Sequence, residues 1–485
     1  MSARIVIKAD REKPIINQHP WVFSGAIDEL KGRPAPGDIV DVVSSKGKFL
    51  ARGYWNPKSQ IQVRLLTWHD EVIDGEWWAK MIARSVASRR PLAVSGGAQR
   101  LINAENDYLP GLIVDRYGDW LVLQALTLGI DQRKQEIATI LADLLKPKGI
   151  FERSDVDVRF KEGLQEVTGV LWGEEPPELI SVAVEKRIEF IDVRKGHKTG
   201  TYLDQRDNQL MLSDFLSTDP KWESLRLLNL FSYTGGFGLS HAGTVTNVDA
   251  SFEVLELAEK IYELNGFPES KVEFIQADVF EYLRDTVDRK IQYDVVVLDP
   301  PKFAHNAQQV DKAARGYKDI NLNAFKVIAP GGYLLTFSCS GAITRDLFQK
   351  IVFGALADSG AAGANRTLSE PSGGSPRGTH VPRRRISQGA AGTGVLEHTF
   401  FEGTRHASEG YRGQGMPCPY KNPLIKTTVR LFLDPFLMAS TVSLFKSSRR
   451  DKSHPYTRTV LVPTTAPARS VPRPASEYVC RYRST

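Results

Sequence analysis

Cysteine is scarce in this chain of 485 residues, which has only Cys339, Cys418 and Cys480. An odd, widely spaced set without a Cys-x-x-Cys pair argues against a disulfide framework and against a zinc site. We therefore expect no bound metal. Cys339 is the only thiol in the periodic part of the sequence, which makes it a candidate for chemistry.

Long apolar runs are also lacking. No stretch of 18 residues is apolar throughout, so the sequence predicts no membrane span. The first residues, MSARIVIKADREKP, lack the apolar run of a signal peptide. A cytoplasmic protein that does not associate with membranes is the expectation that follows.

An excess of positive charge is absent from most of the chain, although the whole carries a formal +6. Residues 358–485 hold 19 Lys and Arg against 8 Asp and Glu, a balance of +11. The first 357 residues hold 44 basic and 49 acidic side chains, a balance of −5. Net charge is therefore no evidence that the ordered part of the chain binds nucleic acid.

Four segments differ in their patterning. Residues 1–72 read as short strands separated by turns, and residues 73–185 mix strands with helices. In residues 186–357 apolar strands alternate with helices, which predicts a doubly wound parallel α/β sheet that binds ligands at the carboxyl ends of its strands. Residues 358–485 are rich in Gly, Ser, Pro and Arg, without periodicity, and are expected to be irregular.

The first two strands of the predicted α/β sheet carry a nucleotide-type signature. A glycine loop, Gly235-Gly236-Phe237-Gly238, follows the first strand, and the next strand ends at Asp249, which can accept both hydroxyls of a ribose. The third strand ends at Asp278, within reach of an adenine amino group. Only 11 positions separate Gly238 from Asp249, against about 20 in dinucleotide enzymes. The spacing and the departure from GxGxxG favour S-adenosylmethionine over NAD.

The fourth and fifth strands end in groups that suit a cytosine. Asp299-Pro300-Pro301 places a carboxyl and a rigid loop at the end of the fourth strand, where a flat base can stack. Cys339 ends the fifth. Cytosine C5 becomes nucleophilic when a thiolate adds to C6, and Asp299, protonated or hydrogen-bonded to N3, would stabilise the electron density that moves onto the ring.

Several strings carry a resemblance to a known family: HPWVFSGAI, PGDIVDV, DYLPGLIVDRYGDWLVLQ, KGHKTGTYLDQRDN, LNLFSYTGGFG, VDAS, LDPPKFA, YKDINLNA and FSCSG. Over residues 1 to about 355 the chain resembles the bacterial 23S ribosomal RNA (cytosine-C5)-methyltransferases of the RlmI type. The resemblance implies a PUA RNA-binding domain at 1–72, an EEHEE-type α+β domain at 73–185 and a Rossmann-like, class I methyltransferase domain at 186–357.

The same resemblance implies roles for individual residues. Cofactor contacts would fall on Gln205, Phe231, Tyr233, Gly235, Gly236, Asp249, Ala250, Ser251, Asp278 and Val279, and also on Asp299. The nucleophile would be Cys339, and substrate contacts would fall on Pro300, Pro301 and Lys302. Asp204, Gln205 and Arg206 would lie beside the cofactor or merely form a turn. Ribosomal RNA would be the partner, with a homodimer as a possible assembly.

The roles of two residues in the first domain, and the function of the chain as a whole, leave alternatives open. His19 and Trp21 are candidates for stacking on an RNA base or, as we favour, for places in the core or at its rim. A base N-methyltransferase in which Cys339 is inert would also fit the Asp-Pro-Pro loop. A third alternative is an RNA-binding protein whose catalytic fold is defective.

The C-terminal segment departs from the family, which continues after FSCSG with two further strands and a motif resembling TxPEGxYLKG. This chain has HVPRRRISQG at 380–389. One set of codons for that string, read one nucleotide later, encodes Thr-Phe-Pro-Glu-Gly-Glu-Tyr-Leu-Lys. We infer a reading-frame shift between about Val352 and Asn365, with read-through past the stop. The fifth strand would then have an open edge, and the composition of the tail favours disorder, although LIKTTVRLFLDPFLMASTVSLF could form a helix or a strand pair. The chain would be poorly stable and weakly active.

Sequencing the gene tests the frame shift. We expect an insertion or deletion in the codons for residues 352–365, whose repair restores the family motif and an earlier stop. An intact single frame, found again in related strains, would contradict the hypothesis.

Overall fold

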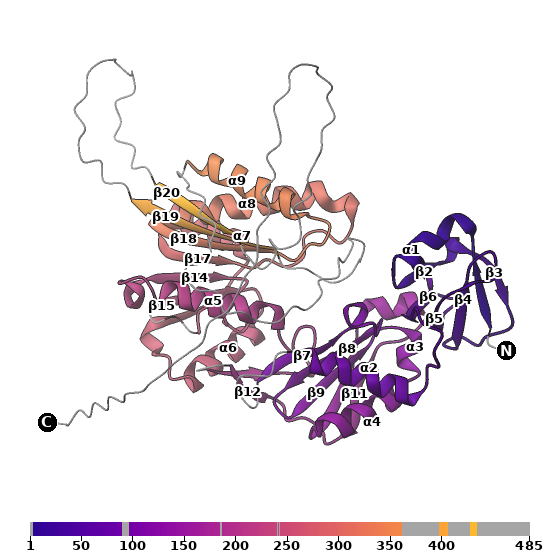
Figure 1. The fold of residues 1–485 in the computed structure, drawn as a ribbon. Coiled ribbons are helices and arrows are strands. Elements are labelled where there is room, and N and C mark those ends of the chain that lie inside the picture. Colours follow the sequence, from indigo (N-terminus) through magenta and orange to yellow (C-terminus); the bar gives the residue numbers. More distant parts are fainter. Residues whose placement is uncertain are drawn as a thin grey trace, which may run out of the picture. The chain divides into compact units, whose positions relative to one another are not determined.

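The computed structural model (Figure 1) describes residues 3–89, 97–184, 187–239, 241, 243–360, 397–405 and 427–433. Cys418 and Cys480 lie outside the described residues. The described strands form sheets of six, five, two and seven strands. None of the described helices combines the length and the hydropathy needed to cross a bilayer.

The first domain is a six-stranded sheet in the order β2-β6-β5-β4-β1-β3. Its elements are β1 (Arg4–Ile7), α1 (Glu12–Ile16), β2 (Trp21–Phe23), β3 (Ile27–Lys31), β4 (Ile39–Val43), β5 (Phe49–Trp55) and β6 (Ile61–Thr67). The short strands expected from the alternation in residues 1–72 are confirmed as β1, β4, β5 and β6. Sequence patterning missed β2, which has three residues, and β3, whose last four residues are exposed.

The middle domain is a five-stranded sheet in the order β11-β10-β9-β8-β7, covered by α2 and α4. Its elements are α2 (Gly75–Ala87), β7 (Ala98–Asn103), β8 (Leu112–Tyr117), β9 (Trp120–Ala125), α3 (Leu128–Asp131), α4 (Lys134–Leu145), β10 (Gly149–Ser154) and β11 (Val167–Gly173). Apolar residues at helical spacing face the sheet, among them Trp78 and Ile82 of α2. The mixed α+β pattern of the sequence is therefore present.

The third domain follows a hairpin of β12 (Ile180–Val184) and β13 (Arg187–Ile191). Five parallel strands form its sheet in the order β16-β15-β14-β17-β18: β14 (Arg226–Leu230), β15 (Thr244–Asp249), β16 (Val272–Gln276), β17 (Tyr293–Leu298) and β18 (Ile328–Ser338). The predicted doubly wound sheet is confirmed. The strand order reverses between β14 and β17, where ligands bind in such folds.

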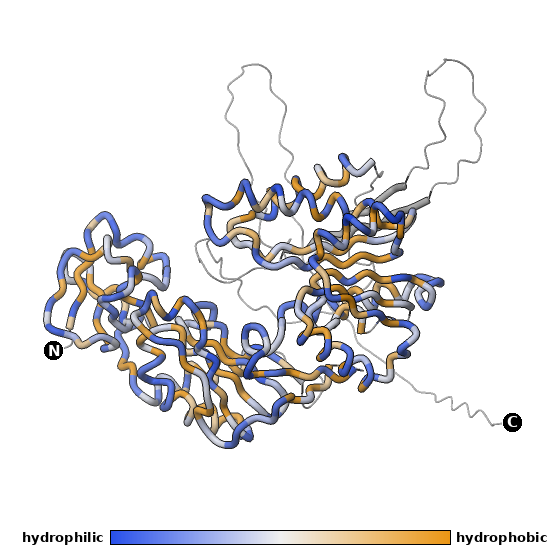
Figure 2. Tube along the Cα trace, turned by 180° about the vertical axis from the view of Figure 1, so that it is seen from behind, coloured by the Kyte–Doolittle hydropathy of each residue, from blue (hydrophilic) through white to orange (hydrophobic). Residues whose placement is uncertain are grey.

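Helices cover both faces of this sheet (Figure 1). They are α5 (Arg206–Leu216), α6 (Phe252–Leu264), α7 (Val279–Asp288), α8 (Val310–Val327) and α9 (Arg345–Ser359). Leu228 and Leu230 point into the core formed with α7, α8 and α9, whereas Leu227 packs on the other face with α5. Because both faces are covered, the central strands β14 (RLLNL) and β17 (YDVVVL) are mostly hydrophobic, and Figure 2 shows orange runs in this sheet.

The edge of this sheet corrects one expectation. β19 (Glu397–Arg405) pairs antiparallel with β18, and β20 (Thr427–Leu433) pairs with β19, so the fifth strand has no open edge. The expected open edge is therefore wrong: both segments contain β-branched and aromatic residues, which favour strands, and they pair along this edge. Apart from residues 358–360 and these two strands, the tail lies outside the described residues. The absence of the family's own C-terminal strands and the frame shift stay predictions.

A buried ion pair joins the first and middle domains. Glu162 is 1% exposed and accepts hydrogen bonds from Arg64 (2.9 Å), Ser59 (2.7 Å) and Asn56 (2.9 Å). Burial by itself would raise the pKa of Glu162, but Arg64 and the two neutral donors hold this pKa below its ordinary value. The carboxylate is therefore charged and fully paired inside the protein.

Replacing Glu162 with Gln should lower the free energy of unfolding by about 3 kcal/mol, because Arg64 then keeps a buried charge without its main partner. Urea denaturation measures this. The matched control is Glu29→Gln, which removes an exposed pair with Lys31 at 3.4 Å and should change the free energy by no more than about 0.5 kcal/mol. Equal effects of the two variants would contradict the importance of the buried pair.

Candidate functional site

The loop after β14 is held in an unusual backbone conformation. Phe231, Tyr233 and Gly235 have φ angles of 57°, 49° and 77°, in the left-handed region. The Tyr262 hydroxyl donates to the Gly235 carbonyl at 2.8 Å, and a Cβ on Gly235 would lie 2.6 Å from the Tyr262 ring. Left-handed non-glycine residues cost energy and cluster at ligand sites. Glycine is thus required at 235, where the loop turns back on itself.

Asp249, at the end of β15, is fixed by backbone groups. Its carboxylate accepts from the Tyr233 N–H at 2.9 Å and from the Ser251 N–H at 3.1 Å, one on each oxygen. Each oxygen keeps a further acceptor position, so the carboxylate can still bind two hydroxyls. Ser251 caps α6 by accepting from the Val254 N–H, and Ala250 lies in the turn between Asp249 and this cap.

Asp278, after β16, is exposed and caps α7 by accepting from the Glu281 N–H at 3.0 Å. Val279 is 2% exposed and its side chain packs in the core with α8 and α9. Only the backbone of Val279 can therefore meet a ligand. Gly236 lies opposite Gln209, whose amide nitrogen would be 2.5 Å from an added Cβ.

Asp299 and Cys339 follow two strands that are paired in parallel, with Leu298 opposite Thr336. The Cys339 Sγ lies 3.6 Å from the carbonyl oxygen of Pro300. Burial raises the pKa of the Asp299 carboxyl to about 7, although Gln205 donates to it at 2.7 Å. Burial, followed by the nearby Asp299, also raises the pKa of the Cys339 thiol.

The Asp-Pro-Pro loop is anchored from behind by Ser340. Its hydroxyl accepts from the backbone N–H groups of Phe303 (3.0 Å) and Ala304 (3.1 Å) and lies 2.9 Å from the Tyr317 hydroxyl. Pro300 is buried, while Pro301 and Lys302 are exposed. The loop therefore presents its exposed part on a support that is itself hydrogen-bonded.

Some site residues escaped the sequence reasoning. His197 stacks on Tyr233 with ring centroids 5.0 Å apart, and Tyr202 packs edge-on against Tyr233 at 5.3 Å. Both belong to the segment KGHKTGTY, in which two glycines and several polar or aromatic residues follow a strand. This concentration of glycine, polar and aromatic residues after a strand is the signal from which a binding segment could have been predicted. Gln205 contacts Asp299 directly, so the turn it belongs to is part of the site.

The residues present fit an S-adenosylmethionine molecule. The three strand ends with a glycine loop and two acids, after β14, β15 and β16, are neighbours in the sheet. Asp249 offers paired acceptors for a ribose, and the tight Gly235 turn allows close approach of the backbone. The aromatic cluster of Tyr233, His197 and Tyr202 borders the glycine loop. The acceptors and the glycine turn suit the ribose and the adenine of this cofactor.

Two family models match the chain. Residues 5–68 match a PUA-like domain, and residues 166–354 match the S-adenosylmethionine-dependent methyltransferases. The predicted PUA-type fold at the N-terminus, the methyltransferase fold and the choice of S-adenosylmethionine over NAD are thereby confirmed.

Curated relatives cover most of the chain. A ribosomal RNA large subunit methyltransferase I from Tolumonas auensis is 46% identical over 368 residues, which cover 74% of this chain and 91% of the relative. The protein of that name from Aeromonas salmonicida is 43% identical over 389 residues, covering 79% and 97%. The one from Escherichia coli O127:H6 is 43% identical over 367 residues, covering 74% and 91%.

A solved structure has the same fold. A putative methyltransferase, SMU.776, complexed with S-adenosylhomocysteine (SAH), superimposes with a TM-score of 0.61 over 73% of this chain and 90% of that one, at 21% identity. A putative SAM-dependent methyltransferase from Streptococcus mutans gives a TM-score of 0.60 with the same coverage. At this identity the likeness establishes the arrangement of elements.

Replacing Asp299 with Asn should stabilise the protein at high pH. Folding raises the pKa of this carboxyl from 3.8 to about 7. The free energy of unfolding of the protein therefore falls as the pH rises between these two values. The Asp299→Asn variant avoids that loss, so it should gain a few kcal/mol above pH 8, at about 1.4 kcal/mol per pKa unit, and nothing at pH 4. Denaturant titrations at both pH values measure the difference.

The matched control is Asp346→Asn, which removes an exposed carboxylate paired with Lys350 at 2.6 Å. Its effect should stay within about 0.5 kcal/mol at both pH values. A gain for Asp299→Asn of the same size at pH 4 and pH 8 would show that the carboxyl is not protonated on folding.

Proposed function

The chain belongs to the family of the ribosomal RNA large subunit methyltransferases I, and we propose that it methylates C5 of a cytosine in 23S ribosomal RNA through a covalent adduct with Cys339. The chain is a methyltransferase that uses S-adenosylmethionine. The target atom and the adduct are our proposals. Ribosomal RNA as the substrate comes from the names of the relatives and from the PUA-like domain.

One observation carries the proposal: the thiol of Cys339 lies against the Asp-Pro-Pro loop, beside a carboxyl whose pKa is raised to about 7. N-methylation of an amino group needs no nucleophilic side chain from the protein, because the nitrogen itself attacks the methyl group. Methylation at C5 does need one, because this carbon has too little electron density of its own. A thiol and a protonatable carboxyl at the ends of adjacent strands meet that need.

Bound S-adenosylmethionine would supply an electrophilic methyl group on a sulfonium sulfur. The backbone around Gly235 and Gly236 would hold its methionine part, Asp249 its ribose and Asp278 its adenine. The half-buried Phe231 and Tyr233 would flank it. Pro301 and Lys302, both exposed, would contact the target nucleotide.

In the covalent step, the Cys339 thiolate adds to C6, and the displaced electron pair moves through the ring to N3, which takes the proton of Asp299. C5 takes the methyl group, and S-adenosylhomocysteine remains. A base then removes the C5 proton, the electron pair restores the C5–C6 double bond, and the thiolate leaves C6. The N3 proton returns to Asp299.

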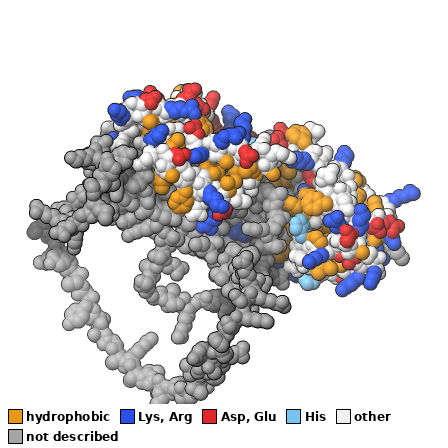
Figure 3. Space-filling view, turned by 90° about the horizontal axis from the view of Figure 1, so that it is seen from above, with side chains coloured by type: hydrophobic (Ala, Val, Ile, Leu, Met, Phe, Trp, Pro, Cys, Tyr) orange, Lys and Arg blue, Asp and Glu red, His pale blue; other side chains and the backbone are white. Residues whose placement is uncertain are grey.

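RNA recognition would rest on shape and local contacts, since the face seen in Figure 3 shows acidic and basic side chains interspersed. Trp21 donates its indole N–H to Glu105 at 2.9 Å and packs beneath Arg64, which supports a place at the domain boundary for this side chain. A ribosomal RNA substrate would put the protein in the cytoplasm. A homodimer stays a prediction.

Trapping with 5-fluorocytidine tests the adduct. An RNA fragment carrying this base forms the C6 adduct and accepts the methyl group, but cannot lose fluorine from C5, so the enzyme should remain attached during denaturing electrophoresis. Cys339→Ala should abolish both trapping and methyl transfer from labelled cofactor, by at least about 1,000-fold.

The matched controls are Cys418→Ala and Cys480→Ala, which should keep both activities. If Cys339→Ala keeps methyl transfer, the N-methyltransferase alternative is favoured and the adduct is excluded. If the unaltered chain binds RNA but transfers no label, the protein is a binding module. Mass spectrometry of digested RNA identifies the methylated atom.

A further inference from the structure

Lys198 occupies a strained place beside the proposed site. It has a left-handed φ of 56° in the turn formed by residues 196–200, called here the lysine turn. Its ammonium group lies 3.2 Å from each carboxylate oxygen of Asp204 and 4.3 Å from the centre of the Tyr202 ring. Its side chain is 44% exposed. The ammonium group is thus held on two sides and open on another.

The lysine turn is electrostatically coupled to the reacting groups. Asp204 is followed directly by Gln205, which donates to Asp299 at 2.7 Å. The charge of Lys198 acts against burial by lowering the pKa of both the Cys339 thiol and the Asp299 carboxyl. The charged groups that act on the thiol are Asp299, from the end of β17, Lys302, from the following loop, and Lys198.

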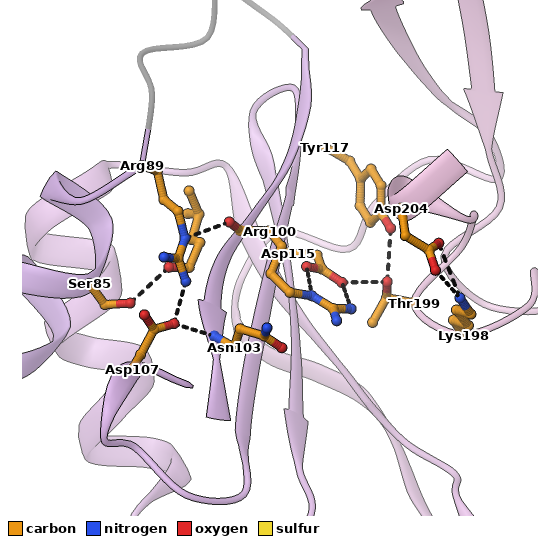
Figure 4. Close-up of polar contacts among 11 residues, drawn as sticks. Ser85, Arg89, Arg100, Asn103, Asp107, Asp115, Tyr117, Lys198, Thr199 and Asp204 are labelled. Carbon is orange, nitrogen blue, oxygen red and sulfur yellow. Dashed lines mark hydrogen bonds and ion pairs between the residues drawn. The ribbon is translucent and has the colours of Figure 1, made fainter. Parts of the chain in front are cut away.

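The middle domain holds the lysine turn through a buried network (Figure 4). Thr199 is 1% exposed and donates to Asp115 at 2.7 Å, and its hydroxyl lies 2.8 Å from that of Tyr117. Asp115, which is completely buried, receives two hydrogen bonds from Arg100, at 2.8 and 2.9 Å. Asp115, Tyr117 and Arg100 all lie on β7 and β8.

A second set of contacts fixes the same segment. Arg153, on β10, donates to the carbonyls of Val193 (2.6 Å) and Gly196 (3.1 Å). The Tyr233 hydroxyl donates to the Gly200 carbonyl at 3.0 Å. Strands of the middle domain and the cofactor loop therefore determine where residues 193–200 lie.

We propose that Lys198 is a positioning residue that favours the reactive thiolate form of Cys339 against the burial of the thiol and the adjacent Asp299, and that the middle domain sets the place of Lys198 through Asp115 and Thr199. The inference rests on the proposed function and deepens it. It gives the middle domain a part in the chemistry beyond linking the RNA-binding fold to the methyltransferase fold. A charge that is set in place before the substrate arrives needs no reorganisation during the reaction.

The test measures the alkylation of Cys339 by iodoacetamide as a function of pH, by intact mass, in the full chain carrying Cys418→Ser and Cys480→Ser. Thiolate, not thiol, reacts, so the midpoint of the profile reports the thiol pKa. Lys198→Met should move the midpoint upward by roughly 0.5–1 pH unit, as expected for losing a partly solvated charge. Lys198→Arg should restore it.

The matched control is Lys195→Met, an exposed lysine three residues earlier in the same segment, which should leave the midpoint unchanged. Methyl transfer by Lys198→Met should fall about three- to tenfold at pH 7 and recover as the pH rises. A loss that is independent of pH, or an unchanged midpoint, overturns the proposal because it assigns Lys198 a structural role only.

The middle-domain part is tested with Thr199→Val, which removes the hydroxyl and keeps the shape of the side chain. The midpoint should rise in this variant, return in Thr199→Ser, and show no further rise when Thr199→Val is combined with Lys198→Met. Additive shifts, or a lower melting temperature with an unchanged midpoint, would refute positioning through Thr199.

The alkylation assay needs neither RNA nor cofactor, so its result is separate from the trapping experiment. A shifted midpoint without a trapped adduct would support the coupling of Lys198 to the thiol and reject the proposed function. Trapping with an unshifted midpoint would do the reverse.

Discussion

The parallel pairing of β17 with β18 is the constraint on which the proposed site depends. Its register places Leu298 opposite Thr336, so the residues that follow, Asp299 and Cys339, emerge from the same edge of the sheet. A slip of one residue would turn every side chain of the slipped strand to the other face. Leu334 and Leu335 pack in different cores on the two faces, so such a slip would require both cores to repack.

That register brings together two acids that disfavour each other's charge. Burial already resists the ionisation of both Asp299 and Cys339, and each negative charge makes the other more costly. The neighbouring donors counter this cost in different ways. Gln205 stabilises the carboxylate by a hydrogen bond, whereas Lys198 acts on both groups at longer range. Two partly buried titratable groups whose charged forms oppose each other contribute little to stability. Their perturbed pKa values are typical of an acid and a nucleophile in a functional site.

Sequence patterns predicted those features that follow from one strand and the residue after it. Asp249, Asp278, Asp299 and Cys339 were found this way, because strand ends in a parallel sheet meet at one edge. Features that depend on side chains from distant segments were not found. The contact between Thr199 and Asp115 joins residues that are 84 positions apart, and no periodicity in either segment predicts it.

The misses in the fold have an equally local cause. β2 is too short to show alternation, and β3 is largely polar because it lies at an edge of its sheet. The two tail strands lie in a segment that was expected to be largely irregular from its composition, although the string that contains β20 was a candidate for a helix or a strand pair. Pairing across an exposed edge depends chiefly on backbone groups, and composition is a weak guide to that.

The middle domain contributes both to the fold and to the proposed site. Its core is an ordinary small α+β layer, yet Asp115, wholly buried in the middle of the network between Arg100 and Thr199, contacts a residue of the methyltransferase segment. A buried carboxylate is costly unless it is fully paired, and here its pairing is complete only when Arg100 and Thr199 both contribute. The middle domain can therefore pair Asp115 fully only when the lysine turn is in place, which couples the two domains in the chemistry that we propose at Cys339.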